Sequence, residues 1–488
     1  MIRRSHFVWL LVSGLLGCGE GDAPATSGGA GDVPIGPPPP VSGDFRFYAD
    51  IVPPGVGSGF AAMPGGHVAI ASTPTKAGAV AGVPFTHFGP GTTVPNYDLL
   101  VAVIDNAGKT AWLKTFATAE IEASTSIVSD EKGDLYVSGQ FKDNVDGLDF
   151  GGGVTVGIGP GELSSFLVKL SGKDGKALWA TSIQSGETYA QQYCGLFRKD
   201  RAVRGGRGAI GCIFDADDGT RKLRIVTKAG ATEIAAAGSD WNAVALAFDP
   251  SSGEPTGSYV LGGVDSNIQS LAITDDGGVV IGGIVEAGTV TDSAGSEPLV
   301  TGADTCFVAS LGPDMKPRFR RTFSGDADSG CLIGDIAVAG PDRVLIGGSA
   351  IGNVDLGDGV ASSGAFGFTG VLGADLSSAG AFERFADARV FGVATDVWGQ
   401  SFVGVATEGD MQSFRYTKRD ATGQVVWESK TYALAAGANP SSLLALGLET
   451  DKSGALTVFG AHKGPITFGD SVYGEDNEPR LFLARFAP

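Results

Sequence analysis

The chain has 488 residues, a formal net charge of −19, 77 glycines and only 4 histidines. Many glycines and a hydrophobic content of 43% are typical of an all-β chain with a packed core and tight turns. The acidity argues against nucleic-acid binding and against electrostatic adhesion to anionic lipid, because both need clustered lysine and arginine.

The first residues have the pattern of an export signal. Arg3 and Arg4 precede an apolar run, 7–16, that is too short to span a bilayer. The Leu-Leu-Gly-Cys stretch that ends at Cys18 resembles the lipobox of bacterial lipoproteins, in which the cysteine becomes the first mature residue and carries acyl chains. The resemblance implies a signal peptide over 1–17 and lipid attachment at Cys18. An ordinary cleaved signal with an incidental cysteine is the alternative.

Residues 18–43 are rich in Gly, Pro, Ser and Ala and show no apolar period. We expect this stretch to be a flexible tether that holds one globular domain, 44–488, away from the membrane. The expected location is the cell envelope, as an outer-membrane lipoprotein that faces the periplasm or the surface. The membrane is then contacted through the anchor only.

A unit of four strands recurs along 44–488. It is clearest where strand A covers 126–128, strand B 135–139, strand C 166–170 and strand D 177–181. Seven copies of strand B occur, at 68–72, 135–139, 209–213, 279–283, 344–348, 401–405 and 456–460. A period above 50 residues that is carried by strands predicts a seven-bladed β-propeller with four antiparallel strands per blade.

The two ends of the domain predict how the ring closes. Six copies of strand D follow a strand C, but the chain stops after the seventh strand C, at 481–486. The segment Phe45 to Asp50 has the pattern of the missing strand D. An N-terminal strand that completes the C-terminal blade would remove the exposed sheet edges.

These units resemble the bacterial seven-bladed β-propeller repeat family, whose members are exported and often lipid-anchored. The matching stretches are 133–139, 141–151, 166–170 and 175–179. The resemblance implies a fold and a location more than a chemistry. The third unit departs most, through a basic insertion at 198–207, and the sixth lacks the long loop between strands B and C.

The turn-then-Trp pattern that ends at Trp112, Trp179 and Trp427 is a second resemblance. It is similar to the Trp-docking repeat of quinoprotein propellers and of the propeller lipoprotein that assists outer-membrane protein assembly. In both families the Trp mainly anchors the packing between blades. A quinoprotein dehydrogenase would need eight units and a calcium site, and neither is present in the sequence.

Once Cys18 is assigned to lipid, four cysteines remain: Cys194, Cys212, Cys306 and Cys331. An even number in an exported chain predicts disulfides. Cys194 and Cys212 lie on adjacent strands A and B of the third repeat, so a cross-strand bridge is plausible and Cys306 and Cys331 are left to pair across neighbouring repeats. Three pairings are possible for four cysteines, and buried free thiols are the alternative.

The pattern of reactive residues indicates no catalytic, cofactor or metal site. The Asp-rich turns, such as 105–108 and 420–423, fit hairpin turns better than calcium loops. His67, His87 and His462 belong to different repeats and have no metal-ligand spacing.

The insertion at 198–207 is the one basic concentration in an acidic body, with Arg201, Arg204 and Arg207. These arginines could contact a partner, or the insertion could be a solvated loop between strands A and B.

Two functions are consistent with the sequence. The first is a monomeric, lipid-anchored propeller that acts as a non-enzymatic binding or scaffold module for an envelope protein or glycan ligand. The alternative is an exported enzyme with its active site in the central channel, such as a quinone-dependent oxidoreductase or a glycan-active enzyme.

Overall fold

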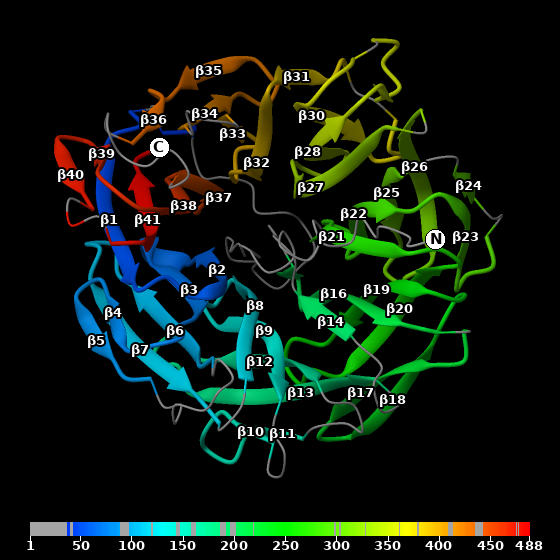
Figure 1. Cartoon of the computed structure of the whole chain (residues 1–488), viewed down its shortest axis with the longest axis horizontal. Helices are drawn as coiled ribbons and strands as arrows, with labels where there is room; N and C mark the ends of the chain where they lie inside the picture. The colour runs from blue at the N-terminus through cyan, green and yellow to red at the C-terminus, as the bar shows by residue number, and fades with distance from the viewer. Residues whose placement is uncertain are drawn as a thin grey trace, which may run out of the picture.

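The structure is a computed structural model that describes residues 37–39, 42–87, 97–118, 121–142, 147–157, 163–185, 192–195, 202–217, 219–296, 299–301, 304–326, 328–360, 362–377, 380–407, 413–434, 443–474, 476 and 478–488. Small antiparallel sheets are arranged in a ring around a central axis (Figure 1). The expected signal peptide, lipid site and almost all of the tether lie outside the described residues.

Each blade has four antiparallel strands, called A to D here from the axis outward. In the order A, B, C and D, they are β2 (Val56–Ala62), β3 (Val68–Thr73), β6 (Leu99–Ile104) and β7 (Thr110–Phe116) in blade 1; β8 (Ile121–Ser129), β9 (Leu135–Lys142), β12 (Ser164–Leu170) and β13 (Ala177–Ser185) in blade 2; β14 (Gln192–Gly195), β16 (Arg207–Asp215), β19 (Trp241–Phe248) and β20 (Pro255–Gly262) in blade 3; β21 (Ser266–Ile273), β22 (Val279–Val285), β25 (Thr305–Leu311) and β26 (Pro317–Gly325) in blade 4; β27 (Gly330–Val338), β28 (Arg343–Ile351), β30 (Phe366–Gly373) and β31 (Glu383–Ala386) in blade 5; β32 (Ala388–Thr395), β33 (Ser401–Thr407), β34 (Ser413–Arg419) and β35 (Val425–Glu428) in blade 6; and β37 (Leu443–Thr450), β38 (Leu456–His462), β41 (Arg480–Phe486) and β1 (Phe45–Val52) in blade 7. This confirms the predicted seven-bladed, all-β fold.

Blade 7 closes the ring as the sequence predicts. Strand β1 pairs with β41 in antiparallel register, with Phe47 opposite Arg485 (Figure 1). The two chain ends also hydrogen-bond to each other, because the Ser42 amide donates to the Pro488 carbonyl at 2.5 Å and the Ala487 amide donates to the Asp44 carbonyl at 2.8 Å. The N-terminal and C-terminal segments therefore share one sheet.

The connections between strands B and C add further strands to the outer edge of the preceding blade. Four blades are extended in this way, by β4 (Gly78–Val80) on β1, β17 (Lys222–Thr227) on β13, β23 (Gly288–Asp292) on β20 and β29 (Val354–Asp355) on β26. Hairpin partners continue three of them: β5 (Val83–Phe85), β18 (Gly230–Ala235) and β24 (Leu299–Thr301). We call the boundary between consecutive blades a seam, and these added strands cover the outer side of a seam.

Two more seams are covered by short hairpins. The pair β10 (Leu148–Asp149) and β11 (Thr155–Val156) places Phe150 against Phe116 of blade 1, with ring centroids 5.3 Å apart. The pair β39 (Ile466–Phe468) and β40 (Ser471–Tyr473) bridges to Leu434, beside β36 (Tyr432–Ala433) of blade 6. The remaining short elements are β15 (Val203–Arg204), which pairs with β16, and a 3₁₀ turn, η1 (Pro64–Gly66).

The Asp-rich turns between strands are hairpin turns. In the A–B turn of blade 2, Asp130 Oδ1 accepts hydrogen bonds from the Lys132 and Asp134 amides at 3.0 and 2.9 Å. In the C–D turn of blade 6, Asp420 Oδ1 accepts from the Thr422 and Gln424 amides at 2.8 and 3.0 Å. Each carboxylate thus satisfies backbone donors of its own turn, which is what the sequence predicts for Asp at these positions.

Candidate binding site

At most seams, an aromatic side chain at one fixed position of strand D packs against the next blade. Trp112 lies opposite Val103, and its indole N–H donates to the Gly172 carbonyl in the C–D turn of blade 2 at 2.7 Å. The ring covers Gly175 of that turn so closely that a Cβ at this glycine would lie 2.8 Å from it. The aromatic ring therefore packs on a glycine in the strand C–D turn of the next blade, and we call this position the seat.

The seat recurs at other seams. Trp179 donates to the Pro250 carbonyl at 3.0 Å and covers Gly253 of blade 3. Trp427 covers Gly43, beside the junction of the two chain ends, and Phe47 covers Gly108 of blade 1. The predicted role of Trp112, Trp179 and Trp427 as packing anchors between blades agrees with this geometry.

At the 3/4 and 4/5 seams the seat is filled from the opposite side. Strand D of blade 3 carries Gly257 at the aromatic position, and Met315 of the next C–D turn packs over it. Leu376 fills the corresponding turn of blade 5, and both Met315 and Leu376 are only 2% exposed. Phe319, which stands at the aromatic position of strand D in blade 4, does not fill the seat and is 44% exposed.

Among the residues that the structure describes, no side chain fills the seat between blades 5 and 6. Strand β31 pairs Glu383 with Thr369, and the same register continued by two residues brings Ala381 to the position that Trp179 has in blade 2. The seat glycine, Gly423, has no atom within 4 Å of an added Cβ. A hollow of about 410 Å³ lies there, and we call it the seat hollow.

Charged side chains surround the seat hollow. Its lining includes Arg343, Glu383 and Arg419. Arg419 forms an ion pair with Glu383 and also donates to the Gly423 carbonyl at 3.3 Å. Arg343 of blade 5 donates to the Ala421 carbonyl of blade 6. Blades 5 and 6 are therefore joined at the rim of the hollow by ion pairs and hydrogen bonds, while its interior holds no side chain of the aromatic type.

The outer side of the same seam is also uncovered. The connection between strands B and C of blade 6 spans only 408–412, and within the described residues no strand pairs with the outer edge of β31. A second hollow of about 340 Å³, the edge hollow, lies beside this edge. Its lining mixes apolar side chains with polar ones. The apolar residues are Phe385, Ala386, Ala388, Val405 and Phe414, and the polar ones are Arg384, Thr407, Ser413, Arg415 and Thr431.

Strand β31 is held firmly despite its open edge. Arg384 makes a bidentate ion pair with Asp358, with nitrogen to oxygen distances of 2.8 and 2.9 Å. The Phe382 amide donates to the same carboxylate at 3.0 Å. The hydrogen bonds from Arg384 hold the pKa of the Asp358 carboxyl well below its usual range. The edge is therefore a rigid surface at neutral pH.

Arg204 and Arg207 of the basic insertion reach across the 3/4 seam. Arg204 forms an ion pair with Asp275 of blade 4, and Arg207 donates to the Pro313 carbonyl. Burial lowers the pKa of Arg207 from its ordinary value. Arg201 lies outside the described residues. In the described part, these side chains contact the neighbouring blade, and a partner contact through them stays a prediction.

A small hollow of about 170 Å³ lies between Arg204 and blade 2. Lys169, which lines it, forms ion pairs with Asp130 and Asp134, each at 3.1 Å. The Tyr136 hydroxyl donates to Asp130 at 3.1 Å, and burial raises the pKa of this phenol. The lining charges thus already have partners inside the protein.

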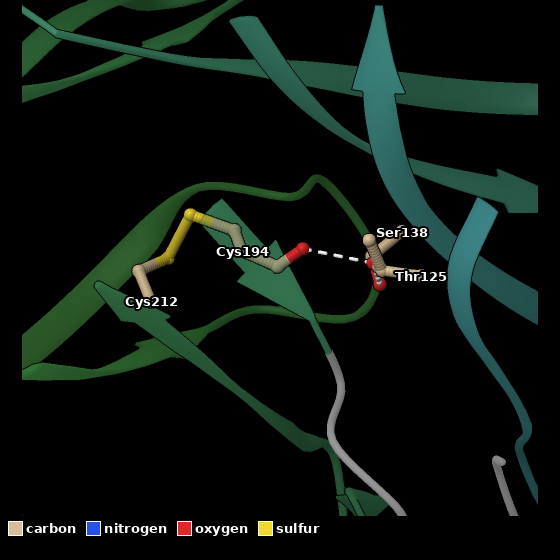
Figure 2. Close-up of a disulfide and its surroundings, with 4 residues drawn as sticks. All are labelled: Thr125, Ser138, Cys194 and Cys212. Carbon is tan, nitrogen blue, oxygen red and sulfur yellow. Dashed lines mark hydrogen bonds between the residues drawn. A yellow bond between two sulfur atoms is a disulfide. The ribbon is translucent and has the colours of Figure 1, made fainter. Parts of the chain in front are cut away.

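The four remaining cysteines form the two expected disulfides. Cys194 on β14 is bonded to Cys212 on β16 within blade 3, and Cys306 on β25 is bonded to Cys331 on β27 across the 4/5 seam. Figure 2 shows that the Thr125 hydroxyl of blade 2 donates to the Cys194 carbonyl, a distance of 2.9 Å. The Cys194–Cys212 bond therefore cross-links two strands of one blade, and the Cys306–Cys331 bond cross-links two neighbouring blades.

Two strands A carry a buried carboxylate. Asp335 and Glu449, both on strands A, are buried. Asp335 accepts a hydrogen bond from the Val393 amide of the next blade at 2.8 Å, and Glu449 accepts from the Ala62 amide of blade 1. We find that these carboxylates join adjacent blades. In the part of the chain that the structure describes, no three His, Cys, Asp or Glu side chains lie together in a way that could hold a metal ion.

The residues of the open seam are the ones that sequence reasoning missed. A signal was present, because the fifth repeat has Ala381 where Trp112, Trp179 and Trp427 stand in other repeats, and the sixth repeat has a short B–C link. Ala381 is in blade 5 and the short link is in blade 6. The two differences fall on one seam because each strand-D side chain packs on a turn of the following blade.

Comparisons with known proteins give similarity to solved propellers only. No family model matches, and no curated protein sequence matches. The WD40 domain of Neurospora crassa Pan2 is similar over 75% of this chain and 89% of its own, with 12% identity and a TM-score of 0.27. Chaetomium thermophilum Sqt1, solved with the N-terminus of ribosomal protein L10, is similar over 88% of this chain and 96% of its own, with 10% identity and a TM-score of 0.38.

The NanB sialidase of Streptococcus pneumoniae is similar over 91% of this chain and 68% of its own, with 8% identity and a TM-score of 0.33. Superpositions this loose carry no argument about function. No helix among the described residues has the length and apolar character needed to cross a membrane.

Proposed function

We propose that this chain is an exported, lipid-anchored β-propeller of the bacterial seven-bladed repeat type that binds a partner at the cell envelope without catalysing a reaction. The observation that carries the binding role is the open 5/6 seam, where a rigid, closed ring leaves two adjoining hollows of about 410 and 340 Å³. A preformed surface lets a partner bind with little ordering of the protein.

Export and anchoring are supported by different residues. Two disulfides suit an oxidising compartment outside the cytoplasm. Arg3 and Arg4, the apolar run 7–16 and Cys18 match the order of a lipoprotein signal. Acyl chains on Cys18 would hold the protein at a membrane, because each buried methylene contributes about 0.8 kcal/mol.

The test is to express the full chain in a bacterium, to fractionate the cells and to measure the mass of the mature N-terminal peptide. The proposal expects a membrane-bound protein whose first residue is acylated Cys18. The Cys18→Ser variant should move to the soluble fraction with its propeller intact. An unmodified N-terminus in the cytoplasm would contradict the proposal.

The binding role needs its own measurement. Wild-type protein and the Ala381→Trp variant, in which the seat hollow is filled, are used to capture envelope proteins and glycans. A partner held by the wild type and lost from the variant supports the proposal, whereas identical captures would exclude the seat hollow as the binding surface.

A further inference from the structure

The open edge of β31 is the place where four other blades receive an added strand. In blade 2, Ser182, Ile183 and Gln184 of strand D are covered by β17 and are all buried. The register of strands C and D assigns Arg384, Phe385 and Ala386 of blade 5 to the same positions. Of these, Arg384 and Phe385 are half-buried and Ala386 is exposed. In the described part of the chain, this place beside β31 therefore holds no strand.

The backbone of this edge is suited to pair with a strand. The Asp387 amide donates to the Ala365 carbonyl at 3.1 Å, which fixes which residues of β31 bond to β30. Because hydrogen-bonded and non-bonded pairs alternate in an antiparallel ladder, the N–H and C=O groups of Arg384 and Ala386 point away from β30. They present two donors and two acceptors at a sheet edge.

The added strands of the other blades show what kind of sequence fits. In β17, Leu223 and Ile225 are buried under the sheet while Lys222 is exposed. In β29, Val354 is buried and Asp355 is exposed. An alternation of apolar and polar residues thus lets a strand pair along strand D and place its apolar side chains inward. At the 5/6 seam, the inward side is the edge hollow, lined by Phe385, Val405 and Phe414.

We propose that the outer edge of β31 binds an extended segment of a partner protein, which adds to blade 5 as an antiparallel strand and inserts alternate apolar side chains into the edge hollow. Main-chain hydrogen bonds to Arg384 and Ala386 supply affinity, and the hollow selects the alternating apolar pattern. The Asp358 to Arg384 ion pair holds the edge in place before binding. This inference rests on the proposed binding function and names its partner class.

The test uses the full-length protein and a phage-displayed library of random seven-residue peptides. Peptides selected on the wild type should alternate apolar and polar residues. Their binding should weaken at least about tenfold in the Ala386→Pro variant, because proline removes the outward N–H without touching the bonds to β30. Val425→Pro, at the exposed start of strand D in blade 6, is the matched control and should bind like the wild type.

Hydrogen exchange on the wild-type protein keeps the test decisive if Ala386→Pro fails to fold. A selected, synthetic peptide should slow exchange within 383–387 severalfold. Slowing at another seam, equal binding to Ala386→Pro in its folded form, or a selection that yields no binder would each overturn the inference. None of these outcomes depends on whether Cys18 is acylated, so the envelope proposal and this one can fail separately.

Discussion

The 2/3 seam and the 5/6 seam have the same strands but are closed differently. At the 2/3 seam, Trp179 fills the seat and β17 covers the outer edge. At the 5/6 seam, no side chain among the described residues fills the seat beside Ala381, and no described strand pairs with the outer edge of β31. The hydrophobic cluster between blades 5 and 6 accordingly consists of alanines, valines and one leucine, without a fully buried aromatic ring.

The comparison shows that a propeller can leave one seam incomplete when the rest of the ring is closed. The paired ends of blade 7 and the disulfide across the 4/5 seam restrain the ring as a whole. Salt bridges such as Arg419 to Glu383 then suffice to hold blades 5 and 6 at the rim. The two hollows at this seam are available to a partner.

Opening the sealed seam should have the largest effect. Trp179→Ala removes an indole that packs on Gly253 and donates to the Pro250 carbonyl. We expect the free energy of unfolding to fall by about 3 kcal/mol, since a large aromatic group leaves a cavity. Phe319→Ala is the matched control, because Phe319 has the same strand position but is 44% exposed. Urea unfolding of both variants measures the difference, and equal losses would contradict the role of the seat.

The second largest effect is expected from removing the disulfide that joins blades 4 and 5. Cys306 and Cys331 enclose a loop of 25 residues, for which loop-closure entropy predicts about 3.5 kcal/mol. The double Cys→Ser variant should lose about 2 kcal/mol and show faster hydrogen exchange in β25 and β27. The equivalent change at Cys194 and Cys212 is the comparison, because that bridge joins strands already paired within one blade. Unchanged exchange in β25 and β27 of the variant that lacks the Cys306–Cys331 bond would contradict its role in joining blades 4 and 5.

Most of the fold, but little of the site, could be predicted from the sequence. The strand-B copies and the pattern at Phe45 to Asp50 gave the blade count and the closure, because periodicity and edge pairing are local properties. The empty seat could not be predicted in the same way. It depends on Ala381 and Gly423, which belong to different repeats and meet only after the blades pack. Likewise, Asp335 and Glu449 occur singly in their strands, and their partners lie on the next blade.

Filling the seat at the 5/6 seam with an aromatic ring should stabilise that seam, as Trp179 does at the 2/3 seam. Ala381→Trp places an indole over Gly423, as Trp179 lies over Gly253. We expect a gain of about 1 kcal/mol in the free energy of unfolding, which is typical of cavity filling. Ala381→Lys is the control, because its side chain is long but has no apolar ring to bury. Thermal unfolding compares the two, and a loss of stability in Ala381→Trp would show that the seat hollow is not shaped for a ring.

The smallest expected effect concerns a buried ion pair that occupies the same position in blade 2 and in blade 6. In blade 2, Lys169 lies 3.1 Å from Asp130, which also accepts a hydrogen bond from Tyr136. In blade 6, the corresponding Lys418 lies 3.8 Å from Asp396, and Phe402 stands where Tyr136 would be. Burial raises the pKa of the Asp396 carboxyl to about 6 and lowers the pKa of Lys418.

The pH dependence of stability follows from the raised pKa of Asp396. Between its ordinary value of 3.8 and about 6, the folded protein binds this proton more tightly than the unfolded chain does. This carboxyl therefore makes the free energy of unfolding fall as pH rises through that window and stay lower above it. Phe402→Tyr adds a hydroxyl that can donate to the ionised Asp396, which lowers its pKa and reduces the fall.

The measurement is the difference in free energy of unfolding between pH 4.5 and pH 7 for the wild type and Phe402→Tyr. We expect the variant to gain about 1 kcal/mol at pH 7 relative to pH 4.5, the usual value of one added hydrogen bond. Phe402→Leu removes the ring without adding a donor, and it should keep the wild-type pH difference while losing stability at both pH values. An unchanged pH difference in Phe402→Tyr would mean that the new hydroxyl does not reach Asp396. In blade 2, the Tyr136 hydroxyl contacts the Pro250 carbonyl of the next blade as well as Asp130, and this second contact would then be what positions the hydroxyl.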